Sequence, residues 1–359
     1  MLTPVHPGHA DELLLAALRP PRRRLPSDDG ERTVVLVEAA TRAERAIRVL
    51  GLHCDMVSFG GDPTVHHCTL RLWDGTVVAR GTGAGDAFAA RTGALLEALE
   101  HYAAVRRHRG RYVDLATGRR ATAPVLGAFS GTGLGCTPAD ATLHALLEAV
   151  QRFTVAGFTA RAVAPGGRAH PHPDTPVVDR TTLPGALADT VRSTERRIGA
   201  GIRLLSLDED GLVPVYLAHA FTGRAGDGHI GLGTSLSETV AVRRACRRLL
   251  ESSLPGAAGT GRHPAGRPVP HAEGSGTAEA RGRALAADPG AVLLPHVADG
   301  LQPVPFVRDR APSTSSAHLG RLVELLSARG HQVRASAIAA LPAGLVLSRA
   351  LLLPAPEPA

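Results

Sequence analysis

Two pairs of side chains that could do chemistry recur at the same spacing in this sequence. Glu97 and Glu100 lie three residues apart in the segment ALLEALEH. Glu148 and Gln151 lie three residues apart in the similar segment ALLEAVQR. Residues at this spacing share one face of a helix. Two such helices side by side would bring three carboxylates together, and their mutual repulsion would favour a bound cation.

A divalent cation is one interpretation of these glutamates. Mg²⁺ suits such a site because it is bound by one or two carboxylates together with the phosphates of a substrate. The alternative is structural, since most glutamates are solvated surface charges. The spacing alone favours neither interpretation, so the segments that precede the helices become important.

A Gly-Thr-Gly segment precedes each helix at nearly the same distance, at 81–83 and at 131–133. The simplest account is two equivalent strand–loop–helix units packed side by side. Glycine-rich loops can also present backbone N–H groups to phosphate. Neither segment is a Walker A loop, because that motif needs a lysine and this chain has none.

Other candidate sites are weaker. His53-Cys54 and His66-His67-Cys68 resemble zinc-ligand pairs but lack the two-residue spacing of a zinc knuckle, so we expect no structural metal there. The nucleophile-elbow motif of hydrolases is also absent. Four cysteines in 359 residues predict no disulfide framework.

The composition predicts a folded cytoplasmic protein. Hydrophobic residues make up 44% of the chain, and neither a membrane-length apolar run nor a secretory signal is present. All 40 basic residues are arginine, and the formal net charge is +7. The arginine runs are short and scattered, and no aromatic stacking platform accompanies them. We therefore expect no specific nucleic-acid partner and no membrane association.

Hydrophobic periodicity and turn signals predict the elements that position these residues. The predicted helices cover residues 12–18, 40–50, 87–106, 138–156, 236–252 and 318–329. The predicted strands cover residues 33–38, 66–72, 76–79, 203–206, 213–220 and 345–353, with Asp74-Gly75 as a two-residue hairpin turn. The segment 254–283 is rich in Gly and Pro and predicts a mobile surface segment.

Together these elements predict an α+β fold, in which two repeated strand–loop–helix units pack on a mixed sheet. We expect an N-terminal α/β region over residues 1–74 and a second domain over residues 75–359.

Three blocks of the chain resemble the YcaO family. The first runs from Gly81-Thr-Gly to His101, and the second from Ser130 to Arg152. The third runs from Val213 through Gly231-Leu-Gly233 to Ala245. The closing run from Leu347 to Pro354 is also similar to a strand of that family. These blocks and their order extend the resemblance over roughly residues 75–359.

The resemblance implies a YcaO-like fold that binds ATP and Mg²⁺ without a P-loop. It implies that Glu97, Glu100 and Glu148 are the metal ligands. It further implies a set of nucleotide-contacting residues, namely Cys136, Asp140, Gln151, Arg152 and Arg349.

Within the YcaO family, the C-terminal sequence favours azoline formation over the other activities. Azoline-forming members of the family end in a PxPxP tail, and this chain ends in Pro354-Ala-Pro356-Glu-Pro358 plus Ala359. The resemblance thus implies a cyclodehydratase component for bacteriocin-type peptide maturation, converting Cys, Ser or Thr to an azoline by phosphorylating the backbone amide oxygen. Pro358 and the Ala359 carboxylate would act at the reacting amide. The implied partners are a precursor peptide and a ThiF-like leader-binding protein, in a homodimer or a hetero-complex.

Several positions depart from the family pattern. Thr82 replaces a lysine, Gly93 a serine, and His101 an arginine, while Gln151 replaces the last glutamate of the second pair. One alternative is therefore a degenerate, non-catalytic subunit that binds peptide or a partner enzyme. Another is YcaO-type formation of a thioamide or an amidine.

Overall fold

The computed structural model describes residue 12 and the ranges 31–105, 112–121, 128–162, 176–208, 211–221, 229–253, 303–307 and 311–354. Two compact units are present, one formed by residues 1–150 with 310–359 and the other by residues 151–309. Residues 13–18 of the predicted first helix, the segment 254–283, and Pro358 and Ala359 lie outside the described residues. No helix within these ranges is both long and apolar enough to cross a membrane.

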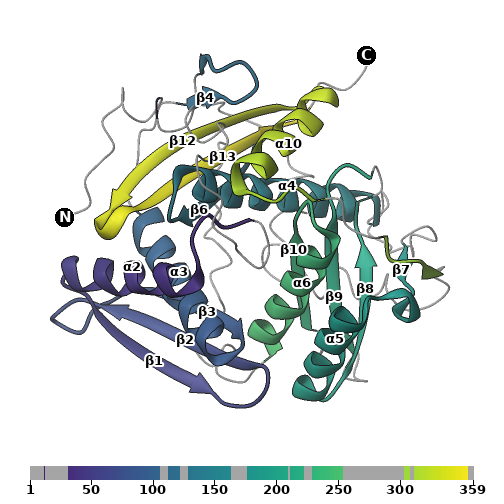
Figure 1. Ribbon diagram of the computed structural model, residues 1–359, viewed down its shortest axis with the longest axis horizontal. Helices are drawn as coiled ribbons and strands as arrows, with labels where there is room; N and C mark the ends of the chain where they lie inside the picture. The colour runs from purple at the N-terminus through teal and green to yellow at the C-terminus, as the bar shows by residue number, and fades with distance from the viewer. Residues whose placement is uncertain are drawn as a thin grey trace. The chain divides into compact units, whose positions relative to one another are not determined.

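The first unit begins with helices packed on a three-stranded antiparallel sheet. Its elements are α2 (Leu36–Val49), β1 (His53–Phe59), β2 (Thr64–Arg71), β3 (Val77–Gly85) and α3 (Ala87–Ala104). The strand order is β1-β2-β3, and α2 and α3 pack on the sheet (Figure 1). The predicted hairpin is confirmed, but its loop is longer than the predicted two-residue turn. The Leu72 N–H donates to the Thr76 carbonyl, so Trp73, Asp74 and Gly75 form the loop. The boundary predicted after residue 74 falls inside this sheet, whereas the compact units divide at residues 150 and 309.

The strand predicted over residues 33–38 is wrong. Helix α2 begins at Leu36, so residues 36–38 of that segment are helical. The apolar run is not buried as a strand would be, because Val35 and Val37 are 44% and 63% exposed. A helical stripe of buried residues, three to four positions apart, decides the structure instead. These residues are Ala39, Ala40, Ala43, Ala46 and Ile47.

A five-stranded antiparallel sheet completes the first unit. Its strands are β4 (Tyr112–Asp114), β5 (Arg120–Ala121), β6 (Phe129–Gly135), β12 (Gln332–Leu341) and β13 (Leu345–Leu353). The order β5-β4-β12-β13-β6 places the end of the chain beside β6, as the yellow and teal ribbons in Figure 1 show. Helices α4 (Pro138–Ala162) and α10 (Ser315–Ala328) and the short turn η3 (Pro342–Gly344) accompany this sheet.

The second unit contains the mixed sheet. Its strands are β7 (Val177–Val178), β8 (Gly201–Ser206), β9 (Val215–Phe221), β10 (His229–Thr234) and β11 (Pro303–Val304), in the order β10-β9-β8-β7-β11. Among these described strands, β7 and β11 are the pair that runs parallel. The turn η1 (Arg180–Thr182) precedes α5 (Gly185–Ile198), and α5 and α6 (Glu238–Ser253) share one apolar core with the sheet.

Within the described residues the strand–helix unit occurs three times, as β3–α3, β6–α4 and β10–α6. In each, glycines of the strand lie against alanines of the helix too closely for any side chain. A Cβ atom at Gly83 would lie 2.0 Å from the Ala90 carbonyl oxygen, and one at Gly233 would lie 2.0 Å from that of Ala241. The predicted α+β architecture is confirmed. The structure corrects its detail, because there are three units and the mixed sheet carries the third.

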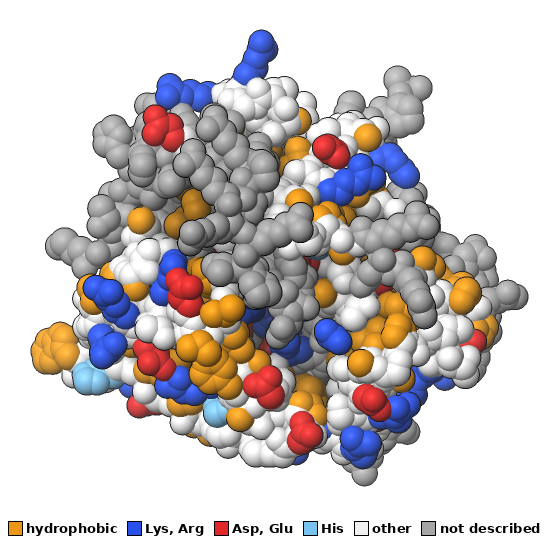
Figure 2. All heavy atoms as spheres, in the orientation of Figure 1, with side chains coloured by type: hydrophobic (Ala, Val, Ile, Leu, Met, Phe, Trp, Pro, Cys, Tyr) orange, Lys and Arg blue, Asp and Glu red, His pale blue; other side chains and the backbone are white. Residues whose placement is uncertain are grey.

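Figure 2 shows how charge is distributed on one face of the molecule. Among the described residues, basic side chains are scattered between acidic and hydrophobic ones and do not form one continuous stripe on this face.

Candidate functional site

The first two strand–helix units place a glutamate on an unpaired strand edge. Among the described strands, β3 and β6 each end their sheet, so the N–H groups on their outer edges have no partner strand there. The Thr82 N–H donates to Oε2 of Glu97 on α3, at 2.7 Å. The Thr132 N–H donates to Oε2 of Glu148 on α4, also at 2.7 Å. The repeat in the sequence is therefore a repeat in hydrogen bonding.

Glu100 connects the first two strand–helix units, β3–α3 and β6–α4. It lies on α3, yet its Oε2 accepts a hydrogen bond from the Leu134 N–H of β6 at 3.0 Å. Its Oε1 also accepts a longer bond from the Thr132 hydroxyl, at 3.4 Å. Thr132 therefore contacts carboxylates from two helices, Glu100 through its hydroxyl and Glu148 through its N–H.

Arg349 places a positively charged guanidinium on the strand next to Thr132. Strand β13 pairs with β6, and Arg349 stands opposite Thr132 in their register. Side chains of directly opposed residues lie on the same face of a sheet. Arg349 is partly buried, and no carboxylate among the described residues pairs with it. A guanidinium in this position is suited to forked contacts with phosphate.

Gln151 and Arg152 lie one turn farther along α4. The Gln151 Oε1 accepts a hydrogen bond from the Thr234 hydroxyl at the end of β10, at 3.2 Å. The Arg152 side chain is exposed. Neither residue is among the hydrogen-bond partners of Thr132, so their predicted nucleotide contacts stay predictions.

Asp140 links separate segments of the first compact unit, which is formed by residues 1–150 and 310–359. Its Oδ1 accepts hydrogen bonds from the Thr33 N–H at 3.0 Å and from the Thr33 hydroxyl at 2.6 Å. The Ser315 hydroxyl donates to the same oxygen at 2.6 Å. Asp140 is only 8% exposed, so these bonds fasten the segment before α2 to the starts of α4 and α10. A nucleotide contact by Asp140 stays a prediction.

Cys136 is part of the hydrophobic core of the first unit. Burial raises the pKa of its thiol to about 11, so the thiol is neutral near pH 7. Its carbonyl oxygen accepts a hydrogen bond from Nη1 of Arg42 at 3.0 Å. These surroundings give the side chain a packing role, and its predicted nucleotide contact is untested.

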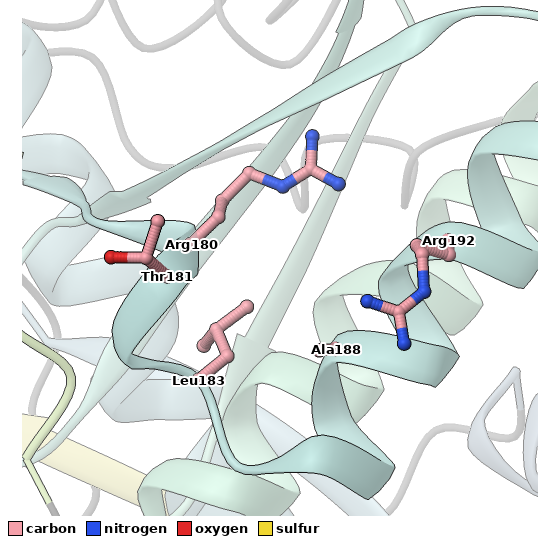
Figure 3. A pocket seen from close by; sticks show the side chains of 5 residues that line it. All are labelled: Arg180, Thr181, Leu183, Ala188 and Arg192. Atoms are coloured by element: carbon pink, nitrogen blue, oxygen red, sulfur yellow. The ribbon is translucent and has the colours of Figure 1, made fainter.

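A surface pocket of about 270 Å³ lies elsewhere, between η1 and α5 (Figure 3). Arg180 and Arg192 stand on either side of an apolar floor that includes Leu183. Both guanidinium groups are already paired. Arg180 makes two 2.7 Å bonds to Glu195, and Arg192 pairs with Asp189. The pocket therefore has less available positive charge than its arginines suggest.

The carboxylates fit a metal that is shared with a ligand. Within the described ranges, no three His, Cys, Asp or Glu side chains form a complete metal-binding group. Mg²⁺ needs fewer protein ligands when phosphates supply the rest. Glu100 and Glu148 meet at Thr132, and a carboxylate oxygen that accepts one hydrogen bond retains a second lone pair. These donors fit a metal–phosphate group better than a bare ion.

Comparison with known families decides the assignment. The profile of a family described as YcaO cyclodehydratase, ATP- and Mg²⁺-binding, matches residues 111–347, about two thirds of the chain. The chain belongs to the YcaO family. ATP and Mg²⁺, the cofactors expected from the resemblance, are those named for the family. The matched range begins after Glu97 and Glu100, so their predicted role as metal ligands stays a prediction.

Solved structures share the fold. A YcaO protein from Methanopyrus kandleri, bound with AMPPCP and Mg²⁺, matches with a TM-score of 0.64 and 21% identity, over 90% of this chain and 92% of that one. A heterocyclase in complex with substrate and cofactor matches with a TM-score of 0.64 and 14% identity. That match covers 95% of this chain but only 55% of the heterocyclase.

An E. coli microcin synthetase McbBCD complex with pro-MccB17 bound matches more distantly. Its TM-score is 0.51 at 10% identity, over 83% of this chain and 86% of that one. No curated protein matches the sequence. At these identities the structural matches establish the fold, and the activity must be argued from the site.

Proposed function

We propose that this protein is the ATP-dependent cyclodehydratase component of a system that modifies a ribosomally synthesised peptide in the cytoplasm. A Cys, Ser or Thr side chain of the peptide attacks the preceding amide carbon, the amide oxygen leaves as phosphate, and an azoline ring remains. Mg²⁺–ATP, when bound, supplies the phosphoryl group. The observation that supports this proposal is the meeting of Glu100 and Glu148 at Thr132, with Arg349 on the neighbouring strand, in a chain of the YcaO family.

The proposed roles follow from charge. Glu97, Glu100 and Glu148 hold Mg²⁺, and the metal in turn reduces their repulsion. Arg349 contacts phosphate oxygens, and the exposed Arg152 is a second candidate for that role. We retain Cys136, Asp140 and Gln151 as predicted contacts of the nucleotide periphery. Removing water around these charges strengthens their interaction with the transferring phosphoryl group.

Glu148→Gln tests the charge of the site without removing its hydrogen bond. The amide oxygen of Gln can still accept from the Thr132 N–H, but the negative charge is lost. We expect calorimetry to show Mg²⁺-dependent ATP binding that weakens by about tenfold in this variant, which is the loss of roughly one charge-assisted contact. Glu324→Gln is the matched control, because Glu324 lies in an exposed ion pair with Arg321 on α10.

Two results would contradict the assignment of the metal site. One is equal ATP affinity of the wild type and Glu148→Gln in the presence of Mg²⁺. The other is an equal loss of affinity in Glu324→Gln, which would show a general effect of charge. Thermal melting of each variant establishes that both proteins are folded.

The proposed partners are a precursor peptide and a ThiF-like protein that binds its leader, in a hetero-complex or as a homodimer. The microcin synthetase match, a complex with pro-MccB17 bound, supports a peptide substrate and a partner assembly. We further propose that Pro358 and the Ala359 carboxylate act at the reacting amide. Deleting residues 356–359 should abolish peptide modification, measured by mass spectrometry, and leave ATP binding nearly unchanged. Modification at the wild-type rate would show that the tail has no catalytic role.

A non-catalytic YcaO subunit is the second candidate, and two contacts favour it. Gln151, which replaces a glutamate, is hydrogen-bonded to Thr234. Arg248 on α6 also stands where a glutamate is typical of the family pattern, and it forms an ion pair with Glu251. Both positions therefore carry less negative charge than the family pattern. The absence of Mg²⁺-dependent ATP binding, with folded protein and with its partner present, would favour this candidate over the enzyme.

A further inference from the structure

Two cysteines meet on neighbouring strands of the three-stranded sheet. The Sγ atoms of Cys54 on β1 and Cys68 on β2 are 3.4 Å apart. In the antiparallel register Cys54 stands opposite Leu70, and Cys68 stands opposite Met56. The two cysteines are therefore diagonal neighbours on the same face of the sheet.

The two thiols differ in access and in acidity. Cys54 is exposed, whereas Cys68 is fully buried beneath the helices. The hydrogen bond from the Cys68 thiol, followed by the positive charge of Arg91, lowers the pKa of Cys54. The same hydrogen bond and burial raise the pKa of Cys68. An accessible thiol whose pKa is lowered, next to a second thiol, is the arrangement of a redox-sensitive cysteine pair.

We propose that Cys54 and Cys68 are a peroxide-sensitive dithiol, a modification site separate from the carboxylate site. The Cys54 thiolate attacks one oxygen of hydrogen peroxide, the O–O bond breaks, and the products are a sulfenic acid and, after protonation, water. The Cys68 sulfur then attacks the Cys54 sulfur as its proton passes to the sulfenic hydroxyl, which leaves as a second water. The net change is the loss of two hydrogen atoms and the formation of one intramolecular disulfide.

The strand arrangement permits this bond. The sulfur–sulfur distance must fall from 3.4 Å to the roughly 2.0 Å of a disulfide. Diagonal partners have Cα atoms about 7–8 Å apart in a regular sheet, at or beyond the usual disulfide limit, so β1 must also shift slightly along β2. Strand β1 can do so because it is the edge strand and pairs with β2 on one side only.

The remaining cysteines provide an internal control. Cys136 and Cys246 are both buried, and burial raises the pKa of their thiols to about 11 and about 12. Cys68 differs from them because it lies beside the exposed Cys54, whose oxidised sulfur it can reach. We therefore expect Cys136 and Cys246 to stay reduced under conditions that oxidise the Cys54–Cys68 pair.

Peroxide treatment of dilute full-length protein tests the proposal directly. Free thiols, counted after denaturation, should fall from four to two, and the intact mass should fall by two hydrogen atoms. Dithiothreitol should reverse both changes, and proteolysis should yield one peptide that links Cys54 to Cys68. Four remaining thiols, or a link that includes Cys136 or Cys246, would overturn the proposal. A disulfide-linked dimer through Cys54 would overturn it as well.

Single variants test the order of the two steps. In Cys68→Ser the sulfenic acid at Cys54 should persist long enough to be trapped by dimedone. In Cys54→Ser the buried Cys68 should stay unmodified. Dimedone labelling of Cys68 in that second variant would contradict the assignment of Cys54 as the reacting thiol. The wild-type measurement remains decisive if either variant fails to fold.

Discussion

The first two strand–helix units and the third share their packing and differ in their charge. Glu97, Glu148 and Arg248 occupy the same position, three residues after the alanine that both glycines of the preceding strand approach. In the first two strand–helix units the glutamate accepts a hydrogen bond from a backbone N–H of an edge strand. In the third, Arg248 instead pairs with Glu251 at 2.9 Å. The same scaffold is thus built with or without the carboxylate, which indicates that the glutamates are not required for the packing itself.

The position three residues farther on extends the comparison. Glu100 accepts hydrogen bonds from Thr132 and Leu134 on the strand of the following unit. Gln151 accepts from Thr234, again on the strand of the following unit. An amide can therefore make this contact between units, and a carboxylate adds negative charge to it. The charge is concentrated in the first two units, where the proposed metal site lies.

The largest expected effect tests whether the three units share one scaffold. Gly83→Ala, Gly133→Ala and Gly233→Ala should each lower the free energy of unfolding by about 2–4 kcal/mol, because the new Cβ would overlap a helix carbonyl. Urea denaturation measures this loss.

Gly320→Ala on α10 is the control for the glycine substitutions. No atom lies within 4 Å of its Cβ position, so the substitution should stabilise the helix by about 0.5–1 kcal/mol. If Gly233→Ala were tolerated while the other two variants unfolded, the third unit would not be equivalent to the first two.

A pH effect of intermediate size is expected beside the third unit. His219 on β9 stands opposite Ile230 of β10 and is 1% exposed. Burial, with a smaller effect of Arg203, lowers the pKa of His219 to about 4. The unfolded chain therefore binds a proton near pH 6.5 that the folded chain resists, and stability falls as the pH drops from about 6.5 to about 4. The expected loss is about 2 kcal/mol at pH 5.

Urea denaturation at pH 7 and pH 5 measures this effect. His219→Gln should remove the pH-dependent part, whereas His53→Gln, at an exposed position on β1, should leave it unchanged. An equal pH dependence of the wild type and His219→Gln would show that another group is responsible.

The smallest expected effect comes from Arg248→Glu, which gives the third strand–helix unit the same charge at this position as the first two. Arg248→Glu removes the partner of Glu251, which is 8% exposed, and places a like charge beside it. We expect a loss of about 1 kcal/mol in the free energy of unfolding, moderated because Arg248 is 47% exposed.

Arg321→Glu is the matched control for Arg248→Glu, since Arg321 and Glu324 have the same spacing but are both largely exposed. Its effect should stay below about 0.5 kcal/mol. Equal losses in the two variants would show that the burial of Glu251 does not matter.

Much of the fold was predictable because its signals are local. The helical periodicity of residues 87–106 and the Asp74-Gly75 turn predicted α3 and the β2–β3 hairpin. The strand predicted over residues 33–38 failed because a short apolar run is ambiguous, and the neighbouring alanine stripe favours a helix. The third strand–helix unit, β10–α6, was not predicted as a repeat because α6 lacks the ALLEA sequence of α3 and α4. Its signal was present in Gly231 and Gly233 and in the alanines that follow.

The candidate site shows the same division between local and distant information. The sequence by itself determined that Glu97 and Glu100 share a helix face and that two similar units occur, because helix geometry fixes which neighbours face the same way. Only the tertiary structure decided that Glu100 bonds to β6 and that Arg349 stands opposite Thr132. These contacts depend on which strands form the edges of the sheets and on the register of strands more than two hundred residues apart. Sequence spacing does not encode either property, because both are fixed only when the sheets assemble.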